Sequence, residues 1–463
     1  MPGALDGVRV LDNGIVQAGT FPARLLADYG AEIIRVEHYR RPDLGRNFCF
    51  PDGVAGDPYW EQSGIYLEQH RNKAYCVGLD AGNPRGRELF LRLVASCDIV
   101  LDSHPPGLME DLGLSYEELR AAREDLVYVS TSGYGYGGPY SEIRSYGMMS
   151  EVMSGISSLN GYAGEAPQRG TIPLTDHPAT YHIAFLMVAA LERRDRTGKG
   201  AWVDVSQYEV GVNLIGDAHV ARAFGANVPG PRGNGDDGHP IAGCVPCDDG
   251  SRWLAVDVCD RASWDGLREL VEFEALDVDR DPWAQPLSAA EQERIREALE
   301  AWARPRDGDE AVSELQARGV PAAVAANARD LLLDPHLEAR GFFWLVDHAP
   351  EQGAGRRAWP GASALLSRTP AELRTRAPML GEHNHLIATG LLECSEEEYE
   401  EYVASGAMGV TPDAAEMKPP PADLEERLHL PPAAQLRIVE FDPRYTERMM
   451  ERFGDTYGSD ATA

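Results

Sequence analysis

The chain has 463 residues, of which 43% are hydrophobic, so it can bury a sizeable core and form roughly two or three domains. Its 43 basic and 74 acidic residues give a formal net charge of −31, which would repel a phosphate backbone and argues against nucleic acid as a partner. The first residues lack a basic segment followed by an apolar run, and the longest apolar stretch is only residues 183–191. We therefore expect neither a secretion signal nor a membrane span, and a cytoplasmic protein.

Residues 7–135 alternate between short apolar runs and helical patterns, an order typical of βαβ units around a parallel sheet. The turn after the first apolar run, residues 13–19, lacks the GxGxxG spacing that lets a dinucleotide pyrophosphate approach the backbone. The sequence therefore predicts a Rossmann-like α/β fold without a nicotinamide or flavin cofactor. The predicted elements are strand 8–11, helix 21–29, strand 32–37, strand 74–77, helix 84–95, strand 98–102 and strand 126–130.

The chain changes character at the loop-rich residues 228–240, which precede a predicted strand at 253–258 and then helices to about residue 319. Apolar patterning like that of the first part returns at residues 320–346 and 378–392. We therefore expect a large Rossmann-like domain built from both ends of the chain, with a smaller α+β domain inserted in it. The expected boundaries are 1–225 and 326–408 for the large domain, 226–325 for the small domain and 409–463 for a C-terminal extension.

The seven cysteines are scattered through a chain without an expected export signal, so we expect reduced thiols. Cys244 and Cys247 form the only close pair, and they precede a turn at residues 248–250 instead of opening a helix. A single CxxC without a second pair of ligands is weak support for zinc. We therefore expect no metal site.

Asp176 stands just before a long apolar helical pattern. Pro178 suits the first helical position, where its missing N–H costs nothing, so Asp176 is expected at the positive end of the helix dipole. That position favours an ionised, nucleophilic carboxylate. An aspartate before a helix can also be a simple cap or turn former, and this position alone leaves both readings open.

Five stretches of the chain, in order, carry a resemblance to a known family. They are residues 5–12 with 16–19, then 26–37, 133–140, 189–205 and 376–383. Through them the chain, over roughly residues 5–405, resembles the family III coenzyme A transferases of the CaiB/BaiF type, such as formyl-CoA:oxalate and carnitine CoA transferases. The resemblance implies a Rossmann-like large domain made from both chain ends and an interlocked homodimer.

Asp176 falls where this family has its catalytic aspartate, so the resemblance implies that it attacks an acyl-CoA thioester. The implied activity moves coenzyme A (CoA) from an acyl-CoA donor to a carboxylic acid acceptor, with CoA as substrate and no tightly bound cofactor, ATP or metal. Gln17 matches a glutamine that lies beside the catalytic aspartate in the formyl-CoA branch. The match implies that Gln17 makes a catalytic contact, and it favours small acids as substrates. The alternative is that Gln17 is a solvated loop residue. Gly233, Gly235 and Gly238 form either an active-site loop or a flexible domain connection.

The resemblance also implies contacts to CoA, mostly near the ends of the first strands. Three positions depart from the formyl-CoA branch: His38 replaces a CoA-contacting arginine, Ser103 with His104 replaces an Asn-Phe pair, and Asp111 replaces an arginine. CoA binding is still expected, with its phosphate contacts left open. The candidate contacts are Ala18, His38, Arg40, Arg41, Arg71, Lys73, Ser103, His104 and Tyr134.

Two other functions are weighed against CoA transfer. The related 2-methylacyl-CoA racemases exchange an α-proton with a histidine whose position is Tyr146 in this chain, so half of the two-base equipment is missing. A non-catalytic CoA- or nucleotide-binding protein is the alternative of another class. A serine hydrolase is disfavoured, because the sequence contains no GxSxG. The family acts on oxalate, carnitine, aryl and dicarboxylic acids, so the resemblance does not fix the donor or the acceptor.

Overall fold

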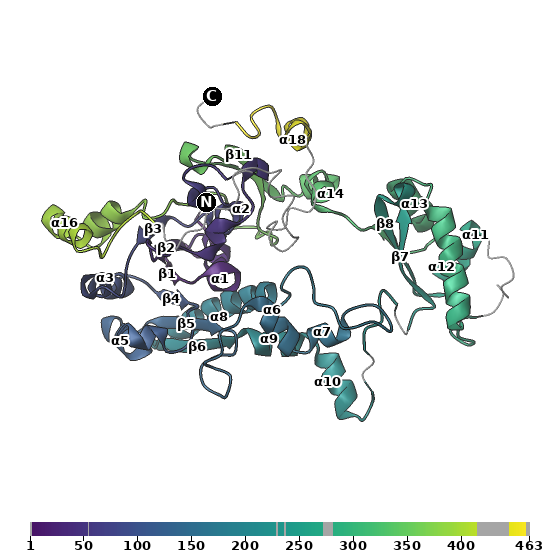
Figure 1. Cartoon of the computed structure of the whole chain (residues 1–463), viewed down its shortest axis with the longest axis horizontal. Coiled ribbons are helices and arrows are strands. Elements are labelled where there is room, and N and C mark those ends of the chain that lie inside the picture. The colour runs from purple at the N-terminus through teal and green to yellow at the C-terminus, as the bar shows by residue number, and fades with distance from the viewer. Residues whose placement is uncertain are drawn as a thin grey trace. The chain divides into compact units, whose positions relative to one another are not determined.

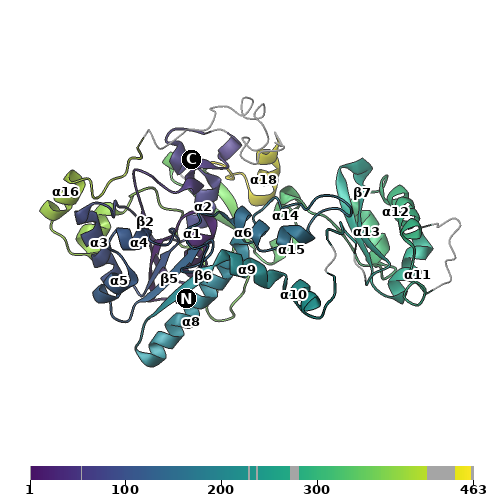
Figure 2. The same cartoon turned by 60° about the horizontal axis from the view of Figure 1, so that its bottom comes forward.

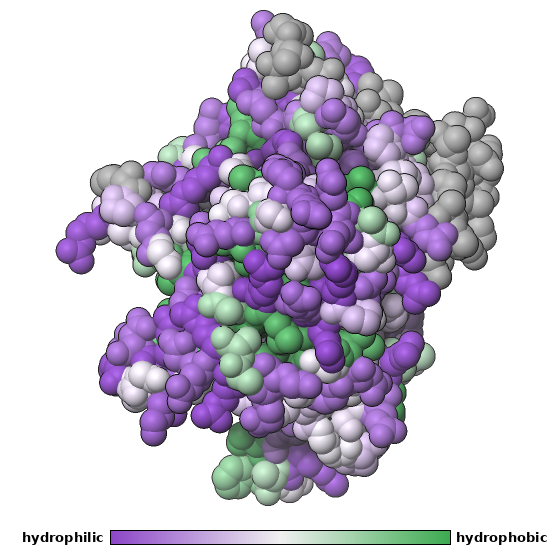
Figure 3. Space-filling model, turned by 90° about the vertical axis from the view of Figure 1, so that its left-hand side faces the viewer, coloured by the Kyte–Doolittle hydropathy of each residue, from purple (hydrophilic) through white to green (hydrophobic). Residues whose placement is uncertain are grey.

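The computed structural model describes residues 2–53, 55–227, 230–235, 238–271, 281–413 and 444–459. The chain divides into two compact units. The first comprises Met1–Ser154, Thr171–Ile215 and Pro335–Ala463, and the second comprises Gly155–Gly170 and Gly216–Asp334. The second unit thus takes in residues 155–170, 216–225 and 326–334, which the sequence had assigned to the large domain. Hydrophilic side chains dominate the face in Figure 3, in keeping with a chain in which 25% of residues are charged.

The first unit is built on a six-stranded parallel sheet (Figure 1). Its strand order is β3-β2-β1-β4-β5-β6, so the order reverses direction between β1 and β4. The structure confirms the α/β class with a parallel sheet, and it adds an edge strand, β6, that was not among the predicted elements. The bounds are β1 (Arg9–Asn13), β2 (Glu32–Glu37), β3 (Tyr75–Gly78), β4 (Ile99–Asp102), β5 (Val127–Ser132) and β6 (Ala201–Ser206).

Both faces of this sheet are covered by apolar side chains of helices. On one face Val10 and Ile33 pack with helices α1 (Val16–Asp28) and α8 (Asp176–Thr197). On the other face the next residue of each strand, Leu11 or Ile34, packs with helix α3 (Pro84–Ala95). Because successive strand residues point to opposite faces, two adjacent apolar positions supply two separate cores. Figure 2 shows the helices around the strands from a second side.

Two helices begin at other residues than the sequence predicted. Helix α1 begins at Val16, five residues before Phe21, and therefore places Gln17 in its first turn. Pro22 lies inside this helix, in its second turn, although proline is best tolerated in the first turn. Helix α8 begins at Asp176 itself, so Pro178 is its third residue. Neither shift moves Asp176 away from the N-terminal turn.

Shorter elements complete the first unit. The C-terminal helix α18 (Tyr445–Phe453) lies against the antiparallel hairpin of β10 (Phe343–Asp347) and β11 (Arg356–Pro360), with the ring centroids of Phe453 and Phe343 6.4 Å apart. After the helix, Ser459 O accepts from Arg356 N at 2.9 Å. The described end of the C-terminal extension therefore packs on this unit. The remaining elements are η1 (Leu44–Asn47), η2 (Pro51–Gly53), η3 (Tyr59–Glu61), α2 (Gly64–His70), α4 (Leu108–Asp111), α5 (Tyr116–Ala122), α6 (Gly147–Met153), α9 (Gln207–Leu214), α15 (Pro335–Ala339), η5 (Pro350–Gln352), a π-helix (Leu386–Leu391) and α16 (Glu396–Ala404).

The second unit has its own core around a three-stranded antiparallel sheet of order β7-β8-β9. Cys244 and Cys247 both lie on β7, and among the described residues no cluster of His, Cys, Asp or Glu could hold a metal ion. Within the same residues, no helix is both long and apolar enough to cross a membrane. The elements are α7 (Ile156–Leu159), α10 (Gly216–Ala223), β7 (Ile241–Cys247), η4 (Asp248–Gly250), β8 (Arg252–Val258), α11 (Arg261–Leu270), α12 (Ala289–Ala303), α13 (Gly308–Gln316), β9 (Ala322–Val324) and α14 (Ala328–Leu332).

Candidate active site

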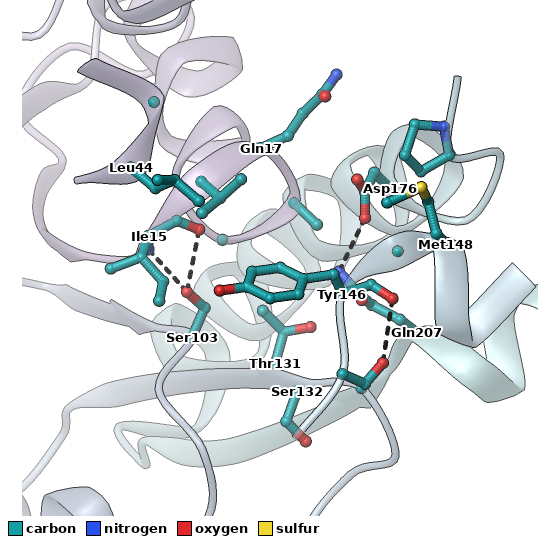
Figure 4. Close-up of a pocket in the computed structure, with 18 of the residues that line it drawn as sticks. Ile15, Gln17, Leu44, Ser103, Thr131, Ser132, Tyr146, Met148, Asp176 and Gln207 are labelled. Atoms are coloured by element: carbon teal, nitrogen blue, oxygen red, sulfur yellow. Dashed lines mark hydrogen bonds between the residues drawn. The ribbon is translucent and has the colours of Figure 1, made fainter. Parts of the chain in front are cut away.

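A cavity of about 370 Å³ opens at the carboxyl ends of the strands of the first unit (Figure 4). Ligands of open α/β sheets bind at this edge, where the strand order reverses, and here that point lies between β1 and β4. Segments that follow β1, β2, β4, β5 and β6 all contribute to it. The lining residues are 15–19, Leu44, Gly45, Phe48, Ile65, Gln69, Ser103, 131–133, 145–148, Pro173, Asp176 and Gln207.

Asp176 lies at one side of this cavity, as the first residue of α8. Its side chain is largely buried, with 8% of the residue exposed. The amide Nε2 of Gln207, the first residue of α9, donates to Oδ1 of Asp176 at 3.4 Å. The helix dipole and this donor both favour a negative charge on the carboxylate.

Gly147 holds the backbone of α6 directly against this carboxylate. A Cβ built on Gly147 would lie 2.2 Å from Oδ1 and 2.7 Å from Oδ2 of Asp176, closer than side-chain atoms can approach. Thr175, the residue before Asp176, donates from Oγ1 to the carbonyl oxygen of Gly147 at 2.9 Å. The starts of α6, α8 and α9 therefore fix the Asp176 side chain from several directions.

Gln17 lines the same cavity from the first turn of α1. Its Nε2 lies 2.9 Å from Nε2 of His177, the residue after Asp176. In Figure 4 the Gln17 side chain points away from the Tyr146 ring. The structure thus brings Gln17 next to the start of α8, where its amide contacts the imidazole of His177 and not the Asp176 carboxylate.

Comparison with known proteins shows to which family this chain belongs. Residues 5–384 match the family model described as CoA-transferase family III. The chain belongs to the family III CoA-transferases. It is 29% identical to the succinyl-CoA–L-malate CoA-transferase alpha subunit of Chloroflexus aurantiacus over 85% of this chain and 90% of that protein. It is 28% identical to a formyl-CoA:oxalate CoA-transferase of Afipia carboxidovorans over 90% of this chain and 100% of that protein.

A solved structure agrees with this assignment. A CaiB/BaiF family protein from Brucella suis has a TM-score of 0.73 and 26% identity, and the match covers 84% of this chain and 100% of that one. As a member of a transferase family, the protein is an enzyme that moves CoA, with a CoA thioester as substrate. The recognition made from five sequence stretches is thereby confirmed at the level of the family.

Two of the predicted CoA contacts in this CoA-transferase are buried ion-pair partners. Lys73 is fully buried, and its Nζ lies 2.7 Å from Oδ2 of Asp12. Burial lowers the pKa of Lys73 to about 8, against the opposing effect of Asp12. Arg71 is fully buried too and pairs with Asp28 at 3.3 Å. Because neither cation reaches the surface, the interpretation of Lys73 and Arg71 as phosphate contacts does not fit the structure.

The other basic candidates lie after the carboxyl end of β2. His38 is half-buried, with Nε2 3.5 Å from Oδ1 of Asp80. Arg40 is exposed and lies over the ring of Tyr39, with Cζ 5.4 Å from the ring centroid. Arg41 is exposed as well. Arg40 and Arg41 lie at the surface, and these two stay predicted phosphate contacts of the CoA-transferase.

Ser103 and His104, the predicted CoA contacts that follow β4, have different neighbours. Ser103 lines the cavity, and its Oγ accepts from Ile15 N at 2.8 Å, so it ties the loop after β4 to the loop after β1. His104 turns to Asp102, with Nδ1 2.7 Å from Oδ1. Burial opposes a charge on His104, but the Asp102 carboxylate outweighs it and raises the pKa of this imidazole.

Two further predicted contacts differ in their access to the cavity. Ala18 is buried and contributes to the cavity wall. Tyr134 is buried, and its hydroxyl lies 2.9 Å from Sδ of Met153. Tyr134 is not among the residues that line the cavity.

The glycine-rich loop belongs to the second unit. Gly233 has a positive φ of 66°, and its N–H donates to Gly161 O at 2.8 Å. Gly235 and Gly238 flank residues 236–237, which lie outside the described residues. That this loop covers Asp176 stays a prediction.

Sequence reasoning missed Gln207 and Gly147 as parts of the site. Gln207 directly follows β6, so the rule that ligands bind at the carboxyl ends of parallel strands could have indicated it. Nothing local marks Gly147, because its role is a close approach to a side chain 29 residues later in the printed sequence. Tyr146, noted only as a replacement for a histidine, lines the cavity.

Proposed function

We propose that this enzyme transfers CoA between an acyl-CoA donor and a carboxylic acid through a covalent intermediate on Asp176. The observation that carries the proposal is one carboxylate at the start of α8, held by Gln207 and facing a cavity at the sheet's carboxyl edge. An ionised carboxylate is a nucleophile that can attack a thioester carbonyl. Positioning and electrostatic stabilisation can then supply most of the acceleration.

The proposed steps balance without an external reagent. An oxygen of Asp176 attacks the thioester carbonyl, a C–O bond forms, the C–S bond breaks, and CoA leaves as a thiolate. The thiolate attacks the aspartyl carbonyl of the anhydride, which gives an aspartyl-CoA thioester and releases the donor acid. The acceptor carboxylate repeats both steps in reverse and regenerates Asp176. One thioester replaces another, so neither ATP nor a metal is required.

The other parts of the proposal come from the resemblance. Gln17 would contact the acyl group or the intermediate, for which its amide must leave His177 and turn toward Asp176. The glycine loop at residues 233–238 would supply backbone N–H donors to the same centre. We also propose that the protein acts in the cytoplasm as an interlocked homodimer without a tightly bound cofactor.

The proposal is tested by isotope exchange between an acyl-CoA and its own free acid. The panel contains hexanoyl-CoA, phenylacetyl-CoA, succinyl-CoA and formyl-CoA, each with the matching ¹³C-labelled acid, and mass spectrometry follows label in the thioester. We expect exchange with at least one pair and none above background in Asp176→Asn. Asp217→Asn, at an exposed acid in the first turn of α10, is the matched control and should keep full exchange.

Persistent exchange in Asp176→Asn would contradict the proposed nucleophile. A parallel incubation distinguishes the racemase alternative: with an α-deuterated acyl-CoA and no added free acid, proton exchange would remove the deuterium. Retained α-deuterium together with Asp176-dependent label exchange is the result that the proposal predicts.

A further inference from the structure

The wall of the cavity is uncharged except at one residue. Among the described residues that line it, Asp176 is the only one with an ionisable carboxylate or a cationic side chain. The polar remainder consists of hydroxyls and amides, and several are already engaged: Ser103 with Ile15, and Ser145 with Ser150 at 2.9 Å. The larger apolar side chains of the wall include Ile15, Leu44, Phe48, Ile65, Tyr146 and Met148.

These apolar side chains surround the space next to the nucleophile. In Figure 4 the Tyr146 ring crosses the cavity between Asp176 and Ser103, and Leu44 points into the cavity from η1. Met148 lies beside Asp176. Besides the amide of Gln207, an acyl group bonded to Asp176 would therefore meet an aromatic ring and aliphatic chains.

The size of the cavity also bears on the substrate. One water needs a cavity of about 10–15 Å³ by the same measure of volume. At about 370 Å³ the cavity is far larger than a formyl or oxalyl group needs, and its part near Ala18 and Ser103 is left to the predicted contacts with CoA. A one- or two-carbon acyl group would leave apolar walls in contact with water, which loses the stabilisation that burial of those walls provides.

We infer that the acyl group carried by Asp176 is that of a monocarboxylic acid with an apolar body, aliphatic or aromatic, and not a dicarboxylic or one-carbon acid. The inference rests on the proposed function and names the substrate class of that same site. A dicarboxylic acyl group would bring a second carboxylate into the cavity, close to Asp176 and without a cation in the described wall to neutralise it. An unpaired charge in such surroundings is strongly disfavoured. The inference differs from the preference for small acids that Gln17 suggested in the sequence.

The first test compares kcat/KM for label exchange between hexanoyl-CoA with hexanoate and succinyl-CoA with succinate, two acyl groups of similar length. We expect the hexanoyl pair to be favoured at least about 10-fold, because only the succinyl group carries a second charge. Phenylacetyl-CoA should fall on the hexanoyl side, and formyl-CoA on the succinyl side. Equal or better exchange with succinyl-CoA would overturn the inference.

The second test places a cation in the wall. Leu44 is 45% exposed, so Leu44→Arg can be accommodated while its guanidinium reaches the cavity. We expect the ratio of succinyl to hexanoyl kcat/KM to rise about 10-fold, since the arginine pairs with the second carboxylate. Met148→Arg, at a residue 42% exposed on another element, should shift the ratio in the same direction. Val403→Arg, on α16 outside the cavity wall and 44% exposed, is the matched control and should leave the ratio unchanged.

The ratio of succinyl to hexanoyl kcat/KM tests the substrate class separately from the proposed function. A ratio measured on one preparation does not depend on the fraction of active enzyme, so partial misfolding of a variant does not alter it. Exchange that requires Asp176 but favours succinyl-CoA in the native enzyme would overturn the substrate class and keep the transferase mechanism. Exchange that survives Asp176→Asn would overturn the mechanism. An unchanged ratio in both Leu44→Arg and Met148→Arg would show that this wall does not contact the acyl group, and would also overturn the inference.

Discussion

Replacing Gly147 by alanine perturbs the proposed nucleophile with a single methyl group. Gly147 begins α6, and its φ lies outside the left-handed region, so alanine can adopt the same backbone without strain. The added Cβ would lie 2.2 Å from Oδ1 of Asp176, whereas an ordinary contact begins at 3.4 Å. The oxygen must therefore retreat by about 1.2 Å, the difference between these two distances.

A displacement of this size affects catalysis more than folding. Misplacing a reacting group by about 1 Å can lower the rate about 100-fold, which corresponds to about 2.7 kcal/mol of transition-state stabilisation. We expect Gly147→Ala to lower kcat for label exchange by about this factor. Thermal unfolding measured alongside should still show a folded protein, since the carboxylate can turn toward the open cavity.

The matched control is Gly216→Ala. Gly216 also begins a helix, α10, and a Cβ there would meet no atom within 4 Å. This variant should keep native exchange rates and gain about 0.4–1 kcal/mol of stability from the lower entropy of the unfolded chain. Full exchange activity in a folded Gly147→Ala variant would refute the reasoning, because the reacting carboxylate could not then be the one that contacts Gly147.

Three further predictions concern single side chains. Gln207→Leu removes the donor to Asp176, and we expect kcat for exchange to fall about 10-fold with little change in KM; an unchanged kcat would remove Gln207 from the mechanism. Burial lowers the pKa of the His348 imidazole from 6.5 to about 4. Between these two pH values the imidazole takes up a proton only in the unfolded state, so the free energy of unfolding falls as the pH drops from about 6.5 to 4. Urea unfolding should show a loss of about 3 kcal/mol over this range that is absent in His348→Gln. Lys73→Met leaves Asp12 without its closest cation, and unfolding at pH 7 should show a loss of about 3–5 kcal/mol; a loss below 1 kcal/mol would mean that the buried pair is replaceable.

The parallel sheet could be predicted because its strands are buried on both faces and read as continuous apolar runs. Five of the six strands were predicted in this way, each close to its observed bounds. β6 differs because it is the edge strand, and Trp202 on it is 42% exposed. Alternating exposure made this strand harder to recognise from the sequence. The start of α1 was missed: the helix begins at Val16, five residues before the predicted start.

The site was only partly predictable for a physical reason. The position of Asp176 at a helix start depends on residues close to it in the chain, so it could be predicted from the sequence. The burial of Arg71 and Lys73 depends on Asp28 and Asp12, which lie on distant parts of the chain and neutralise them only in the folded state. The apolar wall around Asp176 likewise comes from segments after several different strands. Such contacts arise from the topology and not from local spacing.

The central claim is that Asp176 becomes acylated, and hydroxylamine trapping tests it most directly. The enzyme is incubated with each acyl-CoA of the panel and then with hydroxylamine, which converts an activated aspartyl group into a stable hydroxamate. Peptide mass spectrometry then locates the modified residue. We predict a hydroxamate on Asp176 that forms with hexanoyl-CoA or phenylacetyl-CoA and is absent without a donor. Its absence with every donor, in protein shown separately to bind CoA, or its appearance on another residue, would contradict the account.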